Sequence, residues 1–220
     1  MTEIRIGDLQ AWFAKIGEVM TAHADELCEM DAKMGDGDLG LTMKKGFTAM
    51  PEILAAIDEA DLGKKLMKAG MKMASVVPST MGTLMASGVM TGGKELAGKE
   101  SIGAAELLIF FKGYAAGIAK RGKCARGERT VLDAVGAAAD KLEAALTPDM
   151  TLEAAAEIAL EGAKEGVEAT RDMEPKYGKA AVHKAAAVGQ VDQGACAGMY
   201  MVQGCRDYIC GYAQSFFTQW

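Results

Sequence analysis

Residues 9–40 read LQAWFAKIGEVMTAHADELCEMDAKMGDGDLG, an apolar periodic segment followed by a segment of aspartates and glycines. In the first segment, large apolar side chains recur at intervals of three, four or seven residues: Leu9, Trp12, Phe13, Ile16, Met20 and Leu27. This spacing predicts one amphipathic helix that begins after Asp8, a residue able to cap it, and ends near Glu29. The acidic segment Asp31–Gly40, here called the acidic loop, then separates this helix from the next.

Helical periodicity continues along the rest of the chain. Alanine- and methionine-rich stretches with few runs of β-branched residues favour helix over strand. The further helices are expected at 41–60 with an interruption near Pro51, 62–76, 81–90, 104–120, 130–146, 151–171 and 195–212. We expect a loop at Thr91-Gly92-Gly93 and a docked tail containing Phe216, Phe217 and Trp220, whereas 174–193 has no clear pattern. About eight helices with short connections predict an all-α fold, a single domain over residues 1–220 with consecutive helices antiparallel.

Composition excludes several classes of protein. A chain of 220 residues that is 50% hydrophobic can bury a core, which excludes a disordered protein. A net charge of −6 argues against a nucleic-acid-binding protein. No apolar run reaches the roughly 18 residues of a membrane helix, and MTEIRIGD is not a signal segment, so we expect no membrane association and a cytoplasmic location. Five cysteines without a CxxC pair support neither a disulfide framework nor a zinc site.

The acidic loop is the sharpest chemical feature of the chain. It holds the carboxylates Asp31, Asp36 and Asp38, interleaved with glycines that let the backbone fold tightly enough to bring them together. Converging carboxylates repel one another, and a hard cation such as Mg²⁺ or Ca²⁺ relieves that repulsion. A calcium loop is excluded because its twelfth position is Thr42 counted from Asp31 and Phe47 counted from Asp36, not glutamate. Mg²⁺ leaves coordination positions to phosphate, which suggests a nucleotide site; an acidic surface turn with a capping aspartate is the alternative.

Three other segments can contact a phosphate. Ser79-Thr80-Met81-Gly82-Thr83 follows Pro78 at an expected helix start, where backbone N–H groups and hydroxyls can hold a phosphate, although taken alone the stretch favours an ordinary N-cap. The basic segment 121–130 can neutralise phosphates or remain a solvated loop. Asp192 precedes the last helix in a glycine-containing turn and can cap that helix.

The order of these motifs resembles a known family. Asp31-x4-Asp36-x-Asp38-x-Gly40 is followed by the helix start near Ser79, by Arg121-Gly122-Lys123 with Gly127-x-x-Thr130, by Gly178-Lys179-Ala180 and by Asp192-x-Gly194-Ala195. From about Leu9 to Met201 this is similar to the nucleotide-binding L subunit (DhaL type) of phosphotransferase-dependent dihydroxyacetone kinases.

The resemblance implies a fold, an activity and partners. The fold is a closed barrel of eight antiparallel helices that holds ADP and Mg²⁺ at one end. In that family a phosphohistidine on a donor subunit converts bound ADP to ATP, which then phosphorylates a small ketose held by a ketose-binding subunit. The implied partners are therefore these two protein subunits, with no nucleic acid and no membrane, and a homodimer is compatible with the family.

The resemblance also implies the site residues. Asp31, Asp36 and Asp38 would bind two Mg²⁺ ions. The residues implied to contact ADP or ATP are Leu39, Gly40, Leu41, Thr42, Ser79, Thr80, Met81, Gly122, Val131, Lys179, Asp192, Gln193 and Gly194.

Several positions depart from the family's pattern. Leu39 stands where the family has histidine, Thr42 where it has asparagine, Lys179 where it has arginine and Gln193 where it has proline. The stretch Pro78-Ser79-Thr80-Met81-Gly82, which includes Met81, replaces the family's Gly-Gly-Ala-Ser-Gly. These departures keep two alternatives open: a noncatalytic nucleotide-binding regulatory module, and the L component of a small-ketose kinase that uses free ATP.

Overall fold

Helix dominates the computed structural model, which describes residues 1–182, 187 and 189–211. The elements in chain order are β1 (Ile4–Arg5), the 3-10 helix η1 (Ile6–Asp8), α1 (Leu9–Ala22), α2 (Ala24–Ala32), α3 (Leu39–Thr48), α4 (Met50–Ala55), α5 (Leu62–Val76), α6 (Thr80–Glu95), β2 (Ser101–Ile102), α7 (Ala104–Gly122), α8 (Val131–Ala145), α9 (Leu152–Ala169), the 3-10 helices η2 (Thr170–Asp172) and η3 (Lys179–Val182), and α11 (Gln193–Cys210). The all-α prediction is confirmed. The expected docked tail with Phe216, Phe217 and Trp220 lies outside the described residues.

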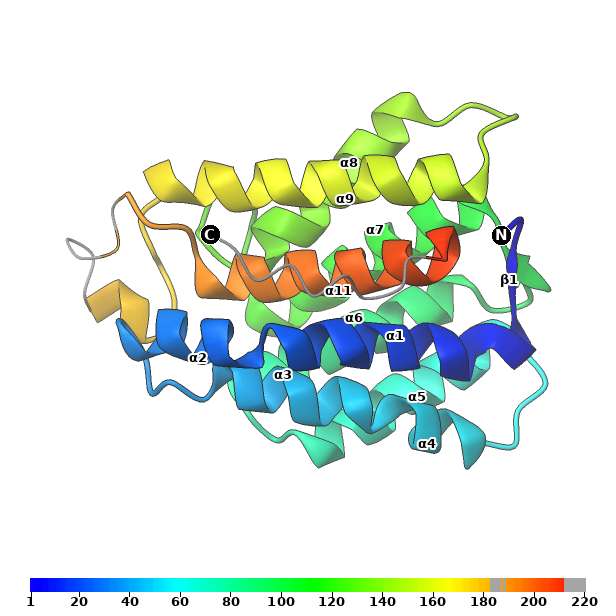
Figure 1. Cartoon of the computed structure of the whole chain (residues 1–220), viewed down its shortest axis with the longest axis horizontal. Coiled ribbons are helices and arrows are strands. Elements are labelled where there is room, and N and C mark those ends of the chain that lie inside the picture. The colour runs from blue at the N-terminus through cyan, green and yellow to red at the C-terminus, as the bar shows by residue number, and fades with distance from the viewer. Residues whose placement is uncertain (183–186, 188, 212–220) are drawn as a thin grey trace.

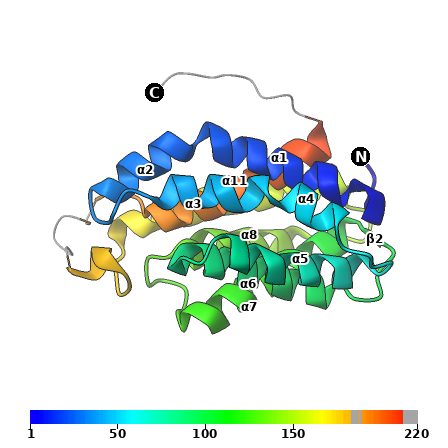
Figure 2. The same cartoon turned by 90° about the horizontal axis from the view of Figure 1, so that it is seen from below.

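Contacts between helices form a ring. Starting at α1, the contacts pass through α3 and α4 to α5, α6, α7, α8, α9 and α11, and α11 packs back against α1. In Figure 1, α1 and α2 run towards the left end of the molecule, α3 and α4 return, and the loop between α2 and α3 lies at that left end. Figure 2 shows α1 on one side of α11, with α5, α6 and α7 on the opposite side. Loops and helix starts that are far apart in sequence therefore meet at one end of the bundle.

Aromatic side chains fill the interior of this ring. Trp12 packs against Phe13 and Phe110 with ring centroids 5.2 Å apart in both pairs, and Phe110 meets Tyr114 edge-on at 5.8 Å. All four side chains are at most 1% exposed. The apolar face predicted for residues 9–29 is thus the face that α1 presents to α7 and its neighbours.

Side-chain caps explain where several helices begin. Asp61, Ser79, Thr151 and Asp192 each accept a hydrogen bond from the backbone N–H three residues ahead, as an N-cap residue does. Asp8 is different: it occupies the cap position of α1, but its carboxylate accepts the backbone N–H of Arg5 instead. The N-cap predictions at Ser79 and Asp192 are confirmed, and the capping role predicted for Asp8 is wrong.

The prediction of one helix from Asp8 to Glu29 is also wrong. The helix breaks at His23, and α2 then continues to Ala32, so Asp31 lies in its last turn. The His23 ring stacks on Tyr200 of α11 with centroids 3.8 Å apart, and its Nδ1 lies 2.9 Å from Glu26 Oε2. The break coincides with a tertiary contact to α11, which periodicity within residues 9–29 cannot reveal.

The loop predicted at Thr91-Gly92-Gly93 is wrong for a different reason. These residues lie inside α6, and both glycines are buried. A Cβ at Gly92 would stand 2.8 Å from the Phe110 ring, and one at Gly93 would stand 2.6 Å from Leu66 Cβ. The glycines therefore permit α6 to approach α7 and α5 closely, rather than marking a turn.

Two smaller corrections concern the region 41–60 and the absence of strands. The expected helix 41–60 is α3 and α4 with a break at Ala49, close to the expected interruption near Pro51, and α4 ends at Ala55 rather than near residue 60. A two-residue antiparallel ladder pairs Ile4 with Ile102, where no persuasive strand was expected. Among the described residues, no helix is both long enough and apolar enough to cross a membrane.

Candidate functional site

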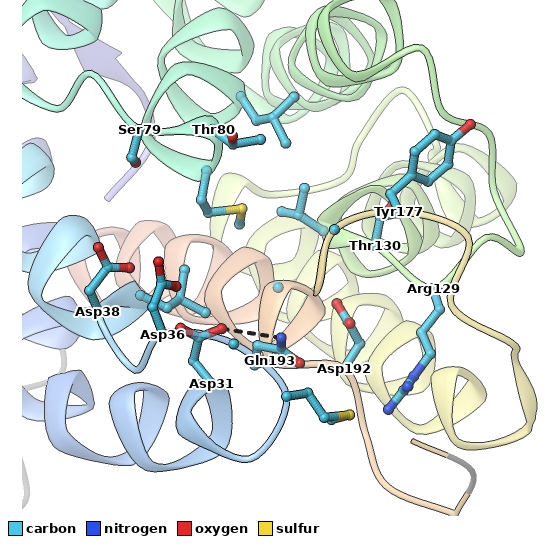
Figure 3. Close-up of a pocket in the computed structure, with 18 residues that line it drawn as sticks. Asp31, Asp36, Asp38, Ser79, Thr80, Arg129, Thr130, Tyr177, Asp192 and Gln193 are labelled. Carbon is cyan, nitrogen blue, oxygen red and sulfur yellow. Dashed lines mark hydrogen bonds between the residues drawn. The ribbon is translucent and has the colours of Figure 1, made fainter. Parts of the chain in front are cut away.

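A pocket of about 350 Å³ opens at the end of the bundle where the acidic loop lies (Figure 3). Its walls come from the acidic loop, the N-terminus of α6, the segment before α8, the segment 177–178 and the N-terminus of α11. We call it the end pocket; it is lined by Asp31, Met34, Gly35, Asp36, Asp38, Leu39, Ser79, Thr80, Met81, Leu84, Arg129, Thr130, Val131, Tyr177, Gly178, Asp192, Gln193 and Gly194. Its volume is in the range of small-ligand sites.

Three carboxylates converge on one side of the end pocket. One oxygen each from Asp31, Asp36 and Asp38 lies within 4.8 Å of the other two. Asp36 and Asp38 are exposed, while Asp31 is 9% exposed. Asp38 occupies the N-cap position of α3 but makes no side-chain capping hydrogen bond, so helix capping does not account for its carboxylate. Three carboxylate oxygens this close together are suited to bind a hard cation, whose positive charge offsets their mutual repulsion.

The backbone of the acidic loop holds Asp31 in place. Gly37, at φ +75°, donates its N–H to Asp31 Oδ2 at 2.9 Å, and the Gly35 N–H donates to the Asp31 carbonyl. A Cβ at Gly35 would stand 2.4 Å from Asp31 Oδ1. The Asp31 carboxylate therefore occupies the space that any side chain at residue 35 would need. A side chain would not fit at residue 35, and the positive φ at residue 37 favours glycine. These two constraints explain why glycines alternate with the aspartates.

Two helix N-termini border the carboxylates. Ser79 begins α6 and its Oγ accepts the N–H of Gly82 at 3.0 Å, while Thr80 is exposed at the first turn. Asp192 begins α11 and accepts the N–H of Ala195 at 2.8 Å. Helix N-termini carry partial positive charge and unpaired N–H groups, which favour anions such as phosphate.

Asp192 is held in a buried environment. It is 5% exposed, and its backbone N–H donates to Thr170 Oγ1 at 2.8 Å. Burial raises the pKa of Asp192 to about 6, although the N–H of Ala195 and the charge of Arg129 favour the ionised form. Hydrogen bonds with residues of η2 and α11 thus fix this aspartate in the wall of the pocket.

Gln193 connects the N-terminus of α11 to the acidic loop. Its Nε2 donates a hydrogen bond of 3.3 Å to Asp31 Oδ1, shown as the dashed line in Figure 3. The amide Oε1 of Gln193 is buried and has no hydrogen-bond partner among the described residues. One end of this side chain thus orients a carboxylate, and the other remains able to accept a hydrogen bond at the pocket wall.

Most residues implied by the resemblance lie together in the end pocket, and some do not line it. Gly40 is buried in α3, where a Cβ would stand only 1.8 Å from the carbonyl oxygen of Ala24. Leu41 and Thr42 border a neighbouring surface depression with Asp38 and Ser79. Gly122 ends α7 beside Leu84, and Leu84 lines the pocket in its place. Lys179 begins η3, and its side chain lies outside the described part of the chain.

Several lining residues were not singled out as site residues by the sequence analysis. Arg129 lay inside the basic segment 121–130, and only its burial distinguishes it from the other cations there: it is 3% exposed. Tyr177 lines the pocket because its hydroxyl donates a hydrogen bond of 2.8 Å to the Lys123 carbonyl, which lies 54 residues earlier in the sequence. Met34 and Leu84 supply apolar surface, and no local pattern identifies them as part of a site.

Fold and site together define a class of protein, an all-helical domain whose open end combines a carboxylate cluster with helix N-termini that can bind phosphate. The chain belongs to the DAK2 domain family, whose sequence profile matches residues 33–207. The match includes Asp36, Asp38 and the N-terminus of α11, while Asp31 precedes it by two residues.

Relatives within this family confirm the predicted resemblance. The chain is 28% identical over 192 residues to the Escherichia coli (strain K12) "PEP-dependent dihydroxyacetone kinase, ADP-binding subunit DhaL", covering 87% of this chain and 91% of that one. It is 30% identical to a "D-erythrulose kinase" of Mycolicibacterium smegmatis, over 83% of this chain but only 32% of that longer protein. The chain is therefore a DhaL-type member of a family of kinases and kinase subunits.

A solved structure shares the fold. The dihydroxyacetone kinase of C. freundii, solved in complex with AMP-PNP and Mg²⁺, superposes with a TM-score of 0.67 over 91% of this chain at 20% sequence identity. This chain spans about a third (34%) of that protein. The all-helical architecture expected from the sequence is thus found in a solved member of the family.

Proposed function

We propose that this protein is the nucleotide-binding subunit of a multisubunit dihydroxyacetone or small-ketose kinase. In this proposal a phosphoryl group passes from a phosphohistidine on a donor subunit to ADP held in the end pocket, and from there to a ketose hydroxyl on a ketose-binding subunit. Similarity to ADP-binding subunits over most of the length of both chains supports the assignment. The protein would act as a phosphotransferase only together with its partner subunits.

The observation that carries the proposal is the convergence of Asp31, Asp36 and Asp38 next to the N-termini of α6 and α11. The carboxylates would hold Mg²⁺, two ions in our proposal, whose chemistry is to neutralise phosphate charge during transfer. Residues at Ser79, Thr80 and Gly194 would orient the phosphates, and Met81, Leu84 and Val131 would provide apolar surface for the base. No general base is required from this chain, because the acceptor hydroxyl arrives on another subunit.

A second candidate is the L component of a small-ketose kinase that uses free ATP. The 30% identity to a D-erythrulose kinase and to a human "Triokinase/FMN cyclase" favours it. The two candidates differ in how tightly the nucleotide is held. A recycled ADP exchanges slowly with solution, whereas a consumed ATP exchanges at least as fast as the enzyme turns over.

The test is the nucleotide content of the purified protein, measured by anion-exchange chromatography after denaturation, with and without a chelator wash. Near-stoichiometric ADP that leaves only with chelator is the expected result. Uptake of ATP that washes out readily would favour the second candidate. A protein that retains no nucleotide and fails to bind ADP in the presence of Mg²⁺ would overturn both; retained nucleotide without phosphoryl transfer to any partner would indicate a regulatory module.

A further inference from the structure

Arg129 combines three features that a loop residue rarely shows together. It is 3% exposed, it lines the end pocket, and its backbone has a φ of +59°, in the left-handed region that a non-glycine residue seldom adopts. Such conformations persist only where the surrounding structure enforces them, and they concentrate at functional sites. None of the assignments above gives this residue a role.

The backbone around Arg129 is enforced by a buried carboxylate. Asp133, 1% exposed in the first turn of α8, accepts the N–H groups of Gly127 and Thr130 at 2.5 and 2.7 Å. These two bonds clamp the chain on both sides of Arg129. Held in this way, the Arg129 side chain reaches the segment that leads into α11, whereas Arg126, three residues earlier, is exposed, pairs with Asp140 and lies 3.8 Å from Asp133.

The guanidinium of Arg129 is only partly used. Its Nη2 donates to the carbonyl of Gln190 at 2.9 Å, across 61 residues of sequence. Its Nε and Nη1 are buried and have no hydrogen-bond partner among the described residues. A buried cation with unpaired donors costs stability, so packing by itself gives no reason for a charged side chain at this position.

The charge of Arg129 acts on the wall of the pocket. It is the one cationic side chain among the described lining residues, and it stabilises the ionised form of the buried Asp192 against desolvation and against the like charge of Asp133. Asp192 caps α11, and the next residue, Gln193, donates to Asp31 in the carboxylate cluster. Arg129 thus bonds to Gln190 in the segment that leads into α11, and Gln193 at the start of that helix bonds to the proposed metal ligand Asp31. Figure 3 shows Arg129, Asp192, Gln193 and Asp31 around the pocket.

We infer that Arg129 is a positioning residue for the end pocket: by anchoring Gln190 and balancing Asp192, it holds the N-terminus of α11 where it completes the nucleotide site. The inference rests on the proposed function for its effect on ADP, but not for its effect on the α11 N-terminus. It adds to the pocket a buried cation that acts through Gln190 and Asp192.

The test compares Arg129→Met with Arg129→Lys and with the control Arg5→Met, which removes the same charge from an exposed residue that pairs with Glu3 at the opposite end of the bundle (Figure 1). Dissociation constants for ADP in Mg²⁺ are measured by calorimetry, and hydrogen exchange by mass spectrometry follows the peptide 190–196. We expect ADP to bind Arg129→Met at least 10-fold more weakly, Arg129→Lys to recover part of the loss, and Arg5→Met to stay within 2-fold of wild type. Exchange in 190–196 should accelerate in Arg129→Met while peptides of α3 and α5 keep wild-type rates.

Wild-type affinity and wild-type exchange in Arg129→Met would overturn the inference, as would equal losses in both methionine variants. Uniformly faster exchange over all helices would reduce Arg129 to a general stability residue and also contradict it. If Arg129→Met does not fold, Arg129→Lys carries the same two measurements, with a smaller expected effect. Failure of the wild-type protein to bind ADP would instead count against the proposed function, and the exchange measurement would still decide whether Arg129 anchors α11.

Discussion

Gln193 Nε2 donates a hydrogen bond to Asp31 Oδ1 at 3.3 Å, joining the start of α11 to the end of α2 across 162 residues of sequence. Asp31 also accepts the Gly37 N–H on its other oxygen, so its carboxylate is oriented from two sides. Ligand carboxylates are commonly held by such outer contacts, and their loss weakens metal binding by roughly 10–100-fold. Gln193 thus orients one carboxylate of the cluster that we propose binds Mg²⁺.

The first prediction concerns this contact. Gln193→Leu removes the donor while keeping a similar volume, and we expect Mg²⁺-dependent ADP affinity to fall roughly 10-fold. Gln10→Leu on the exposed side of α1 is the matched control and should leave the affinity unchanged. Calorimetric titration of ADP at fixed Mg²⁺ measures both variants, and an unchanged affinity for Gln193→Leu would show that Asp31 needs no such support.

The second prediction concerns the carboxylate cluster itself. Asp36→Asn removes one of three converging charges, and we expect retention of ADP in Mg²⁺ to be lost, an effect larger than that of Gln193→Leu. Asp25→Asn, an exposed aspartate on α2, is the control for a change in net charge. Nucleotide released by denaturation is quantified for each protein; wild-type retention in Asp36→Asn would refute the metal assignment.

The third prediction uses the close contact between Gly35 and Asp31. Because an added Cβ would meet Asp31 Oδ1 at 2.4 Å, Gly35→Ala should displace the carboxylate and weaken Mg²⁺ and ADP binding roughly 10-fold. Gly7→Ala, where no atom lies within 4 Å of the new Cβ, should bind as wild type. Equal affinities for the two alanine variants would mean that the loop can rearrange freely around the ion.

The fourth prediction concerns the glycines inside α6. Gly93→Ala would place a Cβ 2.6 Å from both Leu66 Cβ and the Met67 backbone nitrogen, so α5 and α6 must separate. Overpacking of this kind costs about 1–3 kcal/mol of unfolding free energy, more than the helix propensity of alanine returns. Urea denaturation measures the loss, again with Gly7→Ala for comparison. An unchanged or raised midpoint would show that this interface is loosely packed.

The fifth prediction is a pH dependence of stability arising from Asp192. Its pKa in the folded protein is raised to about 6, above the usual value of 3.8, so between these pH values the folded state binds more protons than the unfolded state. The unfolding free energy therefore decreases as pH rises through this window, by on the order of 3 kcal/mol for this group alone.

Asp192→Asn isolates this effect, because the amide oxygen can still accept the Ala195 N–H but cannot ionise in this range. Relative to Asp192→Asn, we expect the wild-type protein to be more stable near pH 4 than near pH 7 in urea denaturation. A difference between the two proteins that does not change with pH would contradict the raised pKa.

The local patterns of the sequence were sufficient for much of the architecture. The helix expected at 62–76 is α5 at the same bounds, because Asp61 caps it and Pro78 lies just beyond its end. The bounds of α7, α8, α9 and α11 also lie within two residues of those expected, since their apolar periodicity and caps are properties of adjacent residues. The glycines at 92 and 93 misled the prediction because glycine serves both turns and close helix packing, and only the neighbouring helix distinguishes the two.

Composition, helical period and the spacing of three aspartates by themselves determined an all-helical protein with a cluster of carboxylates between two helices. Tertiary structure alone decided that His23 interrupts the first helix, that Gln193 reaches Asp31 and that Arg129 is buried beneath α11. The physical reason is range: capping and amphipathic period act within a few residues, whereas closing the helices into a ring brings together groups that the chain separates by 60 to 160 residues. The burial of the Arg129 charge, and hence the role that we infer for it, depends on the closure of the helices into a ring.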